Sequence, residues 1–151
     1  MSRFRVATNA DFDAIVGMMR IYYAEDDYAF SEQASRANLS TFVAHEHLGR
    51  LWVAEVDGVV AGYMAVTLGF SFEYGGLDSF LDEIYIAEPY RRTGLGREAI
   101  DIALDYCRDE GVKAIHLEVE NHRTPARSLY EQRGFETHDR TLMTRLIESS
   151  L

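Results

Sequence analysis

Residues 81–100, which read LDEIYIAEPYRRTGLGREAI, guide the interpretation of the whole chain. The stretch begins with an apolar, β-branched and aromatic run, residues 81–86, that is typical of a buried strand. Pro89 ends this strand, because proline has no N–H group to donate to a central ladder. An R-x-x-G-x-G sequence follows, and apolar residues at helical spacing come directly after it. The stretch therefore predicts a strand, a glycine turn and a helix.

This predicted turn is suited to bind an anion. Glycine lets backbone N–H groups approach a ligand closely, and the positive end of the helix dipole faces that ligand. Arg91, Arg92 and Arg97 add charge that suits a phosphate. A plain tight turn with solvated arginines is the alternative. No Lys-Ser/Thr pair follows the glycines and Ala99 replaces a third glycine, which excludes the P-loop and dinucleotide motifs. We expect the pyrophosphate of a nucleotide-like cofactor here.

Length and composition indicate a single globular domain over residues 1–151. No apolar run approaches the length of a membrane span and no secretory leader is evident, so we expect a cytoplasmic protein without a membrane partner. The net charge of −10 argues against a nucleic-acid partner and favours small cationic substrates or basic peptides. Solubility alone also favours an acidic surface. The single cysteine, Cys107, is expected in the core.

The remaining patterns predict a mixed α/β sheet of about seven strands, with four helices on both faces. Helix-start chemistry at residues 8–11, at Ser31 and at Thr124-Pro125 marks three of the helices, and Gly49 is expected to end the second. Asp57-Gly58 joins the clearest hairpin. Strands are expected at residues 4–7, 50–56, 59–68, 81–86, 114–119, 135–138 and 141–147.

A second motif lies downstream, with L-E-V at residues 117–119 and A-R-S-L-Y-E-Q-R-G-F at residues 126–135. Together with the glycine turn, it resembles the GNAT superfamily of N-acetyltransferases. The turn is similar to that family's acetyl-CoA pyrophosphate loop, and the second motif to its C-terminal motif. The order of elements agrees over nearly the whole chain. The run L-D-E-I-Y-I is also similar to the corresponding strand of spermidine/spermine-type diamine acetyltransferases.

The resemblance implies where acetyl-CoA, or coenzyme A, is bound. The pantetheine arm would pair with the central strand, and the thioester would lie where this strand splays from the next one. Many relatives carry an asparagine seven residues before the motif tyrosine. Arg123 stands there in this chain and Asn121 lies two positions earlier, so the contact of either with coenzyme A is left open. The other expected cofactor residues are Ile84, Tyr85, Ile86, Arg91, Arg92, Thr93, Gly94, Leu95, Gly96 and Arg97.

The resemblance also implies catalytic roles. Tyr130 stands where the family places its general acid, near the sulfur of coenzyme A, and a phenol can protonate a departing thiolate. A core aromatic is the alternative for this residue. Three acids compete as the base that deprotonates the amine. Asp82 and Glu83 are preferred as a pair, with Asp82 favoured by the similarity to diamine acetyltransferases. Glu118 matches a glutamate of ribosomal-protein N-terminal acetyltransferases.

The substrate side is expected to combine carboxylates and aromatic rings, which suit an ammonium cation. A mobile acidic loop without further function is the alternative. We expect N-acetylation of a small primary amine, such as a polyamine, within a ternary complex. A protein N-terminus or lysine is the alternative substrate, and a non-catalytic acyl-CoA-binding module is the alternative class. The resemblance implies a homodimer, and histidine spacing indicates no metal site. The expected substrate residues are Tyr22, Tyr23, Glu25, Asp26, Asp27 and Tyr74.

Overall fold

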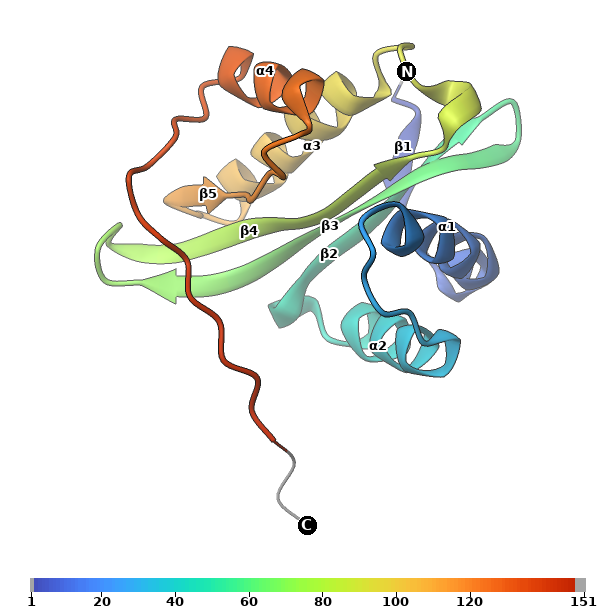
Figure 1. Ribbon diagram of the computed structural model, residues 1–151, viewed down its shortest axis with the longest axis horizontal. Helices are drawn as coiled ribbons and strands as arrows, with labels where there is room; N and C mark the ends of the chain where they lie inside the picture. Colours follow the sequence, from blue (N-terminus) through green and yellow to red (C-terminus); the bar gives the residue numbers. More distant parts are fainter. Residues whose placement is uncertain (1, 149–151) are drawn as a thin grey trace.

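A twisted mixed sheet forms the centre of the computed structural model, which describes residues 2–148 (Figure 1). Its strand order is β1-β2-β3-β4-β5. The first four strands run antiparallel to their neighbours, whereas β5 pairs parallel to β4. The strands are β1 (Phe4–Val6), β2 (Gly49–Val56), β3 (Val59–Ser71), β4 (Gly76–Ile86) and β5 (Ala114–His116).

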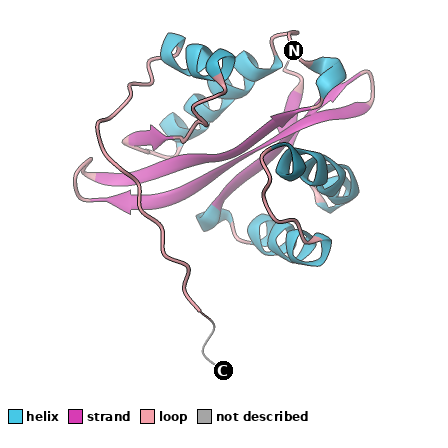
Figure 2. Ribbon diagram, viewed as in Figure 1, coloured by secondary structure: helices cyan, strands magenta, loops and turns pink. Residues whose placement is uncertain are grey.

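Helices cover both faces of the sheet, as the sequence predicts (Figure 2). Helices α1 (Phe12–Glu25) and α2 (Glu32–Ala44) lie on one face and pack through a core cluster that includes Ile15, Val53 and Tyr63. Helices α3 (Leu95–Asp109) and α4 (Thr124–Gln132) lie on the opposite face, over a cluster that includes Trp52 and Ile100. The short 3₁₀ turns are η1 (Asn9–Asp11), η2 (Glu46–Leu48) and η3 (Glu88–Tyr90).

Local sequence signals explain several of these boundaries. Asp57 and Gly58 have φ angles of 51° and 79°, which is the left-handed pair that a tight hairpin between β2 and β3 requires. The Ser31 hydroxyl accepts a hydrogen bond from the Ala34 N–H at 3.2 Å and caps α2. The predicted hairpin and the predicted cap are therefore confirmed.

Other boundaries differ from the prediction. Helix α2 ends at Ala44 instead of continuing to Gly49, because His45 adopts an extended conformation and η2 follows. Strand β4 begins at Gly76, five residues before the predicted start, because it pairs with the extended end of β3. Strand β5 covers residues 114–116 only, because the chain turns away from β4 after His116.

The two predicted closing strands, residues 135–138 and 141–147, are not formed, so the prediction of seven strands is wrong. Residues 136–148, which we call the C-terminal arm, follow α4, pass the β3–β4 turn, where Arg140 contacts Glu73, and then extend away from the body (Figure 1). Within residues 2–148 they pair with no strand of the sheet, and a segment without a hydrogen-bonded neighbour forms no strand. Residues 1 and 149–151 of the predicted domain lie outside the described residues.

Candidate active site

A cleft opens where two neighbouring strands separate. Strands β4 and β5 pair only through residues 78–80 and 114–116. Beyond this contact, residues 81–86 pair with β3 on one side, and their other edge faces open space. The cleft has a volume of about 920 Å³ and is bordered by the end of α1, by β4, by residues 118–123 and by α4. The predicted divergence of the central strand from the next one is therefore present.

A β-bulge lies on the floor of this cleft. Leu81 stands opposite Val66 and Glu83 stands opposite Ala65, which leaves Asp82 without a residue opposite it on β3. The regular alternation of a strand is interrupted at this point, and both Asp82 and Glu83 line the cleft. Bulges occur beside active sites because they redirect a side chain without breaking the sheet.

The two acids of the bulge have different neighbours. Glu83 accepts hydrogen bonds from the hydroxyl groups of Tyr23 at 2.5 Å and of Tyr63 at 2.7 Å. Burial raises the pKa of Glu83, and the charge of Asp82 raises it further, whereas the two tyrosines lower it. Asp82 is open to solvent on one side and has no hydrogen-bond partner within residues 2–148. Its pKa is nevertheless raised, because the surrounding protein removes part of its hydration.

Tyr130 stands on the opposite wall of the cleft. It belongs to α4 and is 9 % exposed, with its ring 5.9 Å from that of Phe135. Burial raises the pKa of Tyr130, and the nearby charge of Arg123 lowers it. In the described part of the chain no side chain forms a hydrogen bond with its hydroxyl, which is therefore free to act on a ligand.

The glycine turn reaches the start of α3 through two residues with left-handed backbone conformations. Gly94 precedes α3 with a φ angle of 88°, and Arg92 has a φ angle of 65°. The first turn of α3 leaves N–H groups without intrahelical acceptors. A Cβ atom on Gly96 would lie 3.3 Å from Leu129 of α4, so glycine allows the close approach of these two helices.

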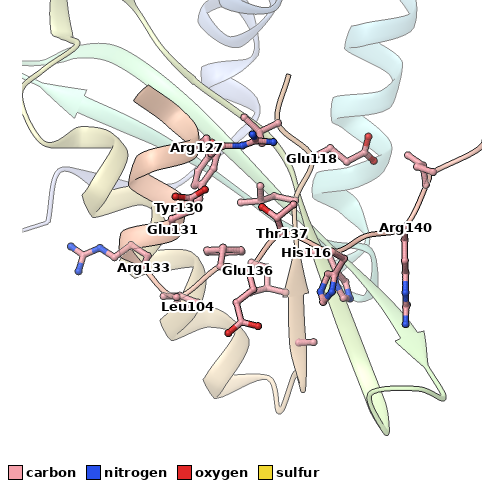
Figure 3. Close-up of a pocket in the computed structure, with 18 of the residues that line it drawn as sticks. Leu104, His116, Glu118, Arg127, Tyr130, Glu131, Arg133, Glu136, Thr137 and Arg140 are labelled. Carbon is pink, nitrogen blue, oxygen red and sulfur yellow. The ribbon is translucent and has the colours of Figure 1, made fainter. Parts of the chain in front are cut away.

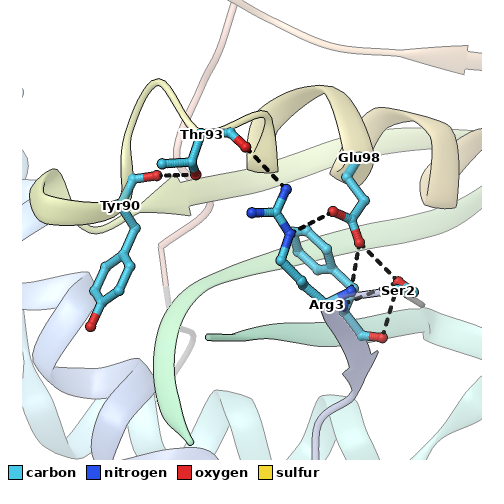
Figure 4. A network of polar contacts seen from close by, with 6 residues as sticks. Ser2, Arg3, Tyr90, Thr93 and Glu98 are labelled. Carbon is cyan, nitrogen blue, oxygen red and sulfur yellow. Dashed lines mark hydrogen bonds and ion pairs between the residues drawn. The ribbon is translucent and has the colours of Figure 1, made fainter. Parts of the chain in front are cut away.

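An arginine from the N-terminal segment holds the turn in place (Figure 4). The side chain of Arg3 donates hydrogen bonds to the Thr93 carbonyl at 3.2 Å and to the Glu98 carboxylate at 2.9 Å. The Thr93 hydroxyl donates to the Tyr90 carbonyl at 2.6 Å. The contact between Arg3 and Glu98 was not predicted from the sequence, because neither segment carries a local pattern that indicates a partner 95 positions away.

Two predicted cofactor arginines pair with predicted substrate acids instead of remaining free. Arg123 contacts Asp26 at 2.8 Å and Glu25 at 3.8 Å. Arg91 lies 3.5 Å from Glu25, donates to the Ile86 carbonyl at 2.8 Å and packs over the ring of Tyr85. These ion pairs connect the end of α1 to both sides of the cleft.

The structure brings some of the other predicted residues to the cleft and leaves others outside it. Tyr22 and Tyr23 line the cleft, and burial raises the pKa of Tyr22 to about 12. Asp27 is exposed outside it. Tyr74 and Asn121 line a second groove on the other side of β5, and Glu118 lines both spaces.

Within residues 2–148, no group of three or more histidine, cysteine, aspartate or glutamate side chains is placed to hold a metal ion. The described helices also include none that is long and apolar enough to cross a membrane.

Comparisons with known proteins agree with this arrangement. The profile of the acetyltransferase (GNAT) family matches residues 10–135. The uncharacterized N-acetyltransferase YhfO of Bacillus subtilis is 29% identical over 132 residues, which cover 87% of this chain and 88% of that protein. An N-alpha-acetyltransferase of Sulfurisphaera tokodaii is 29% identical over 143 residues, which cover 88% of this chain and 79% of that protein.

Solved structures show the same fold. An integron cassette protein from the mobile metagenome of Cole Harbour Salt Marsh superposes with a TM-score of 0.87 at 30% identity, and the match covers 98% of this chain and 92% of that one. The family match, the divergent strands and the glycine turn before α3 lead to one conclusion: the chain belongs to the acetyltransferase (GNAT) family, whose enzymes use acetyl-CoA as the acetyl donor.

Proposed function

We propose that this acetyltransferase acts on a small cationic primary amine, which attacks acetyl-CoA directly within a ternary complex. One observation carries the proposal. The cleft places two acids without a cationic partner, Asp82 and Glu83, on its floor and the free hydroxyl of Tyr130 on its wall. A proton acceptor for the amine and a proton donor for the leaving group therefore share one cleft.

The residues present fit the cofactor that the family uses. The unpaired edge of residues 81–86 offers backbone groups to an extended pantetheine arm. The first turn of α3 offers N–H groups to a pyrophosphate. Arg92 and Arg97 form no ion pair within residues 2–148, so both charges are available there. When bound, acetyl-CoA supplies the thioester carbonyl that the amine attacks.

The charge of the cleft supports a cationic substrate. Six carboxylates line it, whereas only two arginines do, and these two arginines pair with Glu25 and Asp26. Asp82, Glu83 and two further acids remain without a cation, and their field attracts an ammonium group. The rings of the two tyrosines on α1 can form cation–π contacts with the ammonium group. The two further acids are Glu118 and Glu120, and the two tyrosines are Tyr22 and Tyr23.

Asp82 is the acid that we assign to the proton transfer. An amine arrives mostly as an ammonium ion, and it must lose a proton before its nitrogen lone pair can attack. The oxygens of Asp82 are free and its pKa is raised, which makes it a better acceptor than an ordinary aspartate. Glu83 is fixed by two tyrosine hydroxyls, so its role is to hold the positive charge beside Asp82.

Tyr130 completes the proposed reaction. Burial raises the pKa of the Tyr130 hydroxyl above its ordinary value, so this residue is neutral at physiological pH and can donate its proton. The phenol gives this proton, or a hydrogen bond, to the sulfur as the carbon–sulfur bond breaks.

A protein N-terminus is the second candidate substrate. The relative from Sulfurisphaera tokodaii bears the name N-alpha-acetyltransferase and matches 88% of this chain. Glu118, which lines the cleft, is then the candidate base. The same negative cleft suits a basic peptide, so charge alone does not separate the two candidates.

A thiol-release assay with purified protein and acetyl-CoA tests the proposal. The panel contains polyamines, amino acids, aminoglycosides and pools of peptides with free N-termini, and a reaction without amine measures background hydrolysis. We expect release above background with a small diamine or polyamine. Release with peptides alone would transfer the assignment to the second candidate. The absence of release with every small amine would overturn the proposal.

A further inference from the structure

The bulge at Asp82 changes the face of the sheet to which the odd-numbered residues of β4 point. Before the bulge, the Ser79 hydroxyl lies 3.2 Å from the thiol sulfur of α3, and Leu81 belongs to the core cluster under α3 and α4. After the bulge, Tyr85 belongs to the cluster under α1 and α2. Residues two apart on a regular strand stay on one face. The extra residue therefore turns Glu83 toward α1.

Two tyrosine hydroxyls from different elements meet Glu83 on this face. Tyr23 of α1 donates a hydrogen bond to Oε2 of Glu83 at 2.5 Å, and Tyr63 of β3 donates to Oε1 at 2.7 Å. An ionised carboxylate only accepts hydrogen bonds, so each of its oxygens is paired with a phenol. Burial raises the pKa of both tyrosines, and each hydroxyl therefore keeps its proton and remains a donor. The two contacts orient Glu83 and stabilise its ionised form.

Tyr63 was not predicted as a site residue, and its ring and its hydroxyl have separate roles. The side chain is 0 % exposed and packs in the cluster under α1 and α2, so it does not reach an amine in the cleft. The ring fills the core as a phenylalanine ring would. The hydroxyl is a polar group whose burial is costly unless it is paired, and its partner is Glu83. The phenol and the carboxylate therefore satisfy each other inside the fold.

Within residues 2–148, no basic side chain pairs with Glu83. The opposite wall of the cleft carries Tyr130 on α4 and Glu118 on the segment after β5, as Figure 3 shows. The arginine of that wall, Arg123, pairs with Asp26 at 2.8 Å instead. The titratable groups that face Glu83 from the elements packed against it are Asp82 from β4, Tyr22 and Tyr23 from α1, and Tyr63 from β3.

The charge of Glu83 therefore depends on the two phenols. Burial and the charge of Asp82 raise the pKa of Glu83, whereas the hydrogen bonds from Tyr23 and Tyr63 lower it. In the described part of the chain Asp82 has no such donor, and burial alone raises its pKa. When two neighbouring acids compete for one proton, donors on one of them leave the proton to the other.

We propose that Tyr63 and Tyr23 are positioning residues, which hold Glu83 as the anion that binds the ammonium group of the substrate and leave the acceptance of its proton to Asp82. The inference rests on the proposed function. Tyr63 acts only through Glu83, because its buried side chain does not reach the substrate.

NMR of protein with isotope-labelled glutamate carboxyl groups measures the titration of Glu83 without any substrate. The signal of Glu83 is the one that Glu83→Gln removes. Tyr63→Phe and Tyr23→Phe are each compared with the unmodified protein, and the control Tyr106→Phe removes a hydroxyl from a buried tyrosine of α3. Because Tyr23 is only partly buried and lines the cleft, its variant keeps the test valid if Tyr63→Phe does not fold.

In both tyrosine variants Glu83 should take up its proton about one pH unit higher than in the unmodified protein, because a single phenol then opposes burial and the charge of Asp82. Tyr106→Phe should leave this titration unchanged. An unmoved titration in the tyrosine variants would overturn the inference, and a loss of stability alone would assign a purely structural role to the two hydroxyls.

Steady-state kinetics with a small amine give the second readout. In Tyr63→Phe the KM for the amine should rise about three- to tenfold at about pH 6, with kcat changed less than about twofold, because protonated Glu83 no longer attracts the ammonium group. This difference in KM should shrink at about pH 8, where Glu83 is ionised in both proteins. A KM change of equal size at both pH values would contradict the proposal. If no small amine reacts, the proposed function fails and this inference with it, whereas an unmoved Glu83 titration in an active enzyme overturns this inference alone.

Discussion

Asp11 and the pair Asp82–Glu83 are acids that the fold partly removes from water, yet their surroundings are opposite. Asp11 is 4 % exposed and receives two hydrogen bonds from the Arg5 guanidinium, each 2.9 Å long, and one from the Thr8 N–H at 2.8 Å. These partners hold the pKa of Asp11 below its ordinary value. Within residues 2–148 no cation contacts Asp82 or Glu83, and burial raises the pKa of each of them.

The difference separates an acid that supports the fold from the two acids to which we assign a role in the reaction. Asp11 stabilises the start of α1, because it stays ionised and its partners are satisfied. The surroundings of Asp82 and Glu83 favour the protonated carboxyl group, which costs stability, and we assign the acceptance of a proton to Asp82.

The largest effect is expected for Tyr130→Phe, which removes the proposed proton donor opposite the two acids. Turnover should fall about 100- to 1,000-fold, because the leaving sulfur loses its proton source. Affinity for coenzyme A should change by less than about threefold, since the aromatic ring remains. Thiol-release kinetics and calorimetric binding of coenzyme A measure the two quantities.

The matched control for that variant is Tyr106→Phe, which removes a hydroxyl from a buried tyrosine that packs against Trp52 away from the cleft. Its turnover should equal that of the unmodified protein. Equal, small losses of turnover and coenzyme A affinity in Tyr130→Phe would contradict a role for the phenol in proton transfer.

A loss of about 100-fold in turnover is expected for Asp82→Asn, because an amide does not accept the proton of the ammonium group. Glu83→Gln should raise the KM for the amine more than it lowers kcat, because it removes an attractive charge but not the proton acceptor. Steady-state kinetics with a saturating amine and acetyl-CoA separate the two effects. If Glu83→Gln lowers kcat more than Asp82→Asn does, the two roles must be exchanged.

Asp11→Asn should lower the stability of the protein and leave its turnover unchanged. The free energy of unfolding should fall by about 1–3 kcal/mol at neutral pH, because a buried charge-assisted network loses its acceptor. The contribution of Asp11 is present above the ordinary aspartate pKa of 3.8 and is lost as the pH falls toward the lower folded value. Urea denaturation measures this change, and thiol release should show unchanged kcat. A lower kcat without a loss of stability would remove the contrast between the two sites.

The smallest effect is expected for Arg3→Ala, which removes the support of the glycine turn. The KM for acetyl-CoA should rise by about three- to tenfold with little change in kcat, because only the positioning of the phosphate site is affected. Arg5→Ala serves as the comparison, since Arg5 contacts Asp11 and Glu55 and does not touch the turn. A similar KM change in both variants would indicate a general effect of the N-terminal segment.

Short sequence patterns predicted the turns and the helix cap, because these features depend on only a few neighbouring residues. The Asp57-Gly58 hairpin, the Ser31 cap and the turn at Gly94 follow from backbone preferences of a few residues. The divergence of β4 and β5 was predicted from the resemblance to the GNAT family and is present. Tyr130 lines the cleft between these strands, and its role as general acid stays a prediction.

The features that were missed depend on distant parts of the chain. The support of the turn by Arg3 and Glu98 joins segments 95 residues apart. The bulge at Asp82 arises from the register between β3 and β4, which no single stretch reveals. The predicted strand at residues 141–147 is not formed, because a strand needs a neighbour with which to share hydrogen bonds and the pattern of one segment does not reveal that neighbour.

The pH dependence of kcat/KM for the amine, measured between about pH 4 and pH 9 for the unmodified protein and for Asp82→Asn, tests the central claim most directly. Because burial raises the pKa of Asp82, the acidic limb of the unmodified protein should lie above the ordinary aspartate value of 3.8, and activity should fall as the pH drops through it. In Asp82→Asn this limb should disappear and leave a low activity. An acidic limb that stays in place in Asp82→Asn would contradict the assignment of Asp82 as the proton acceptor.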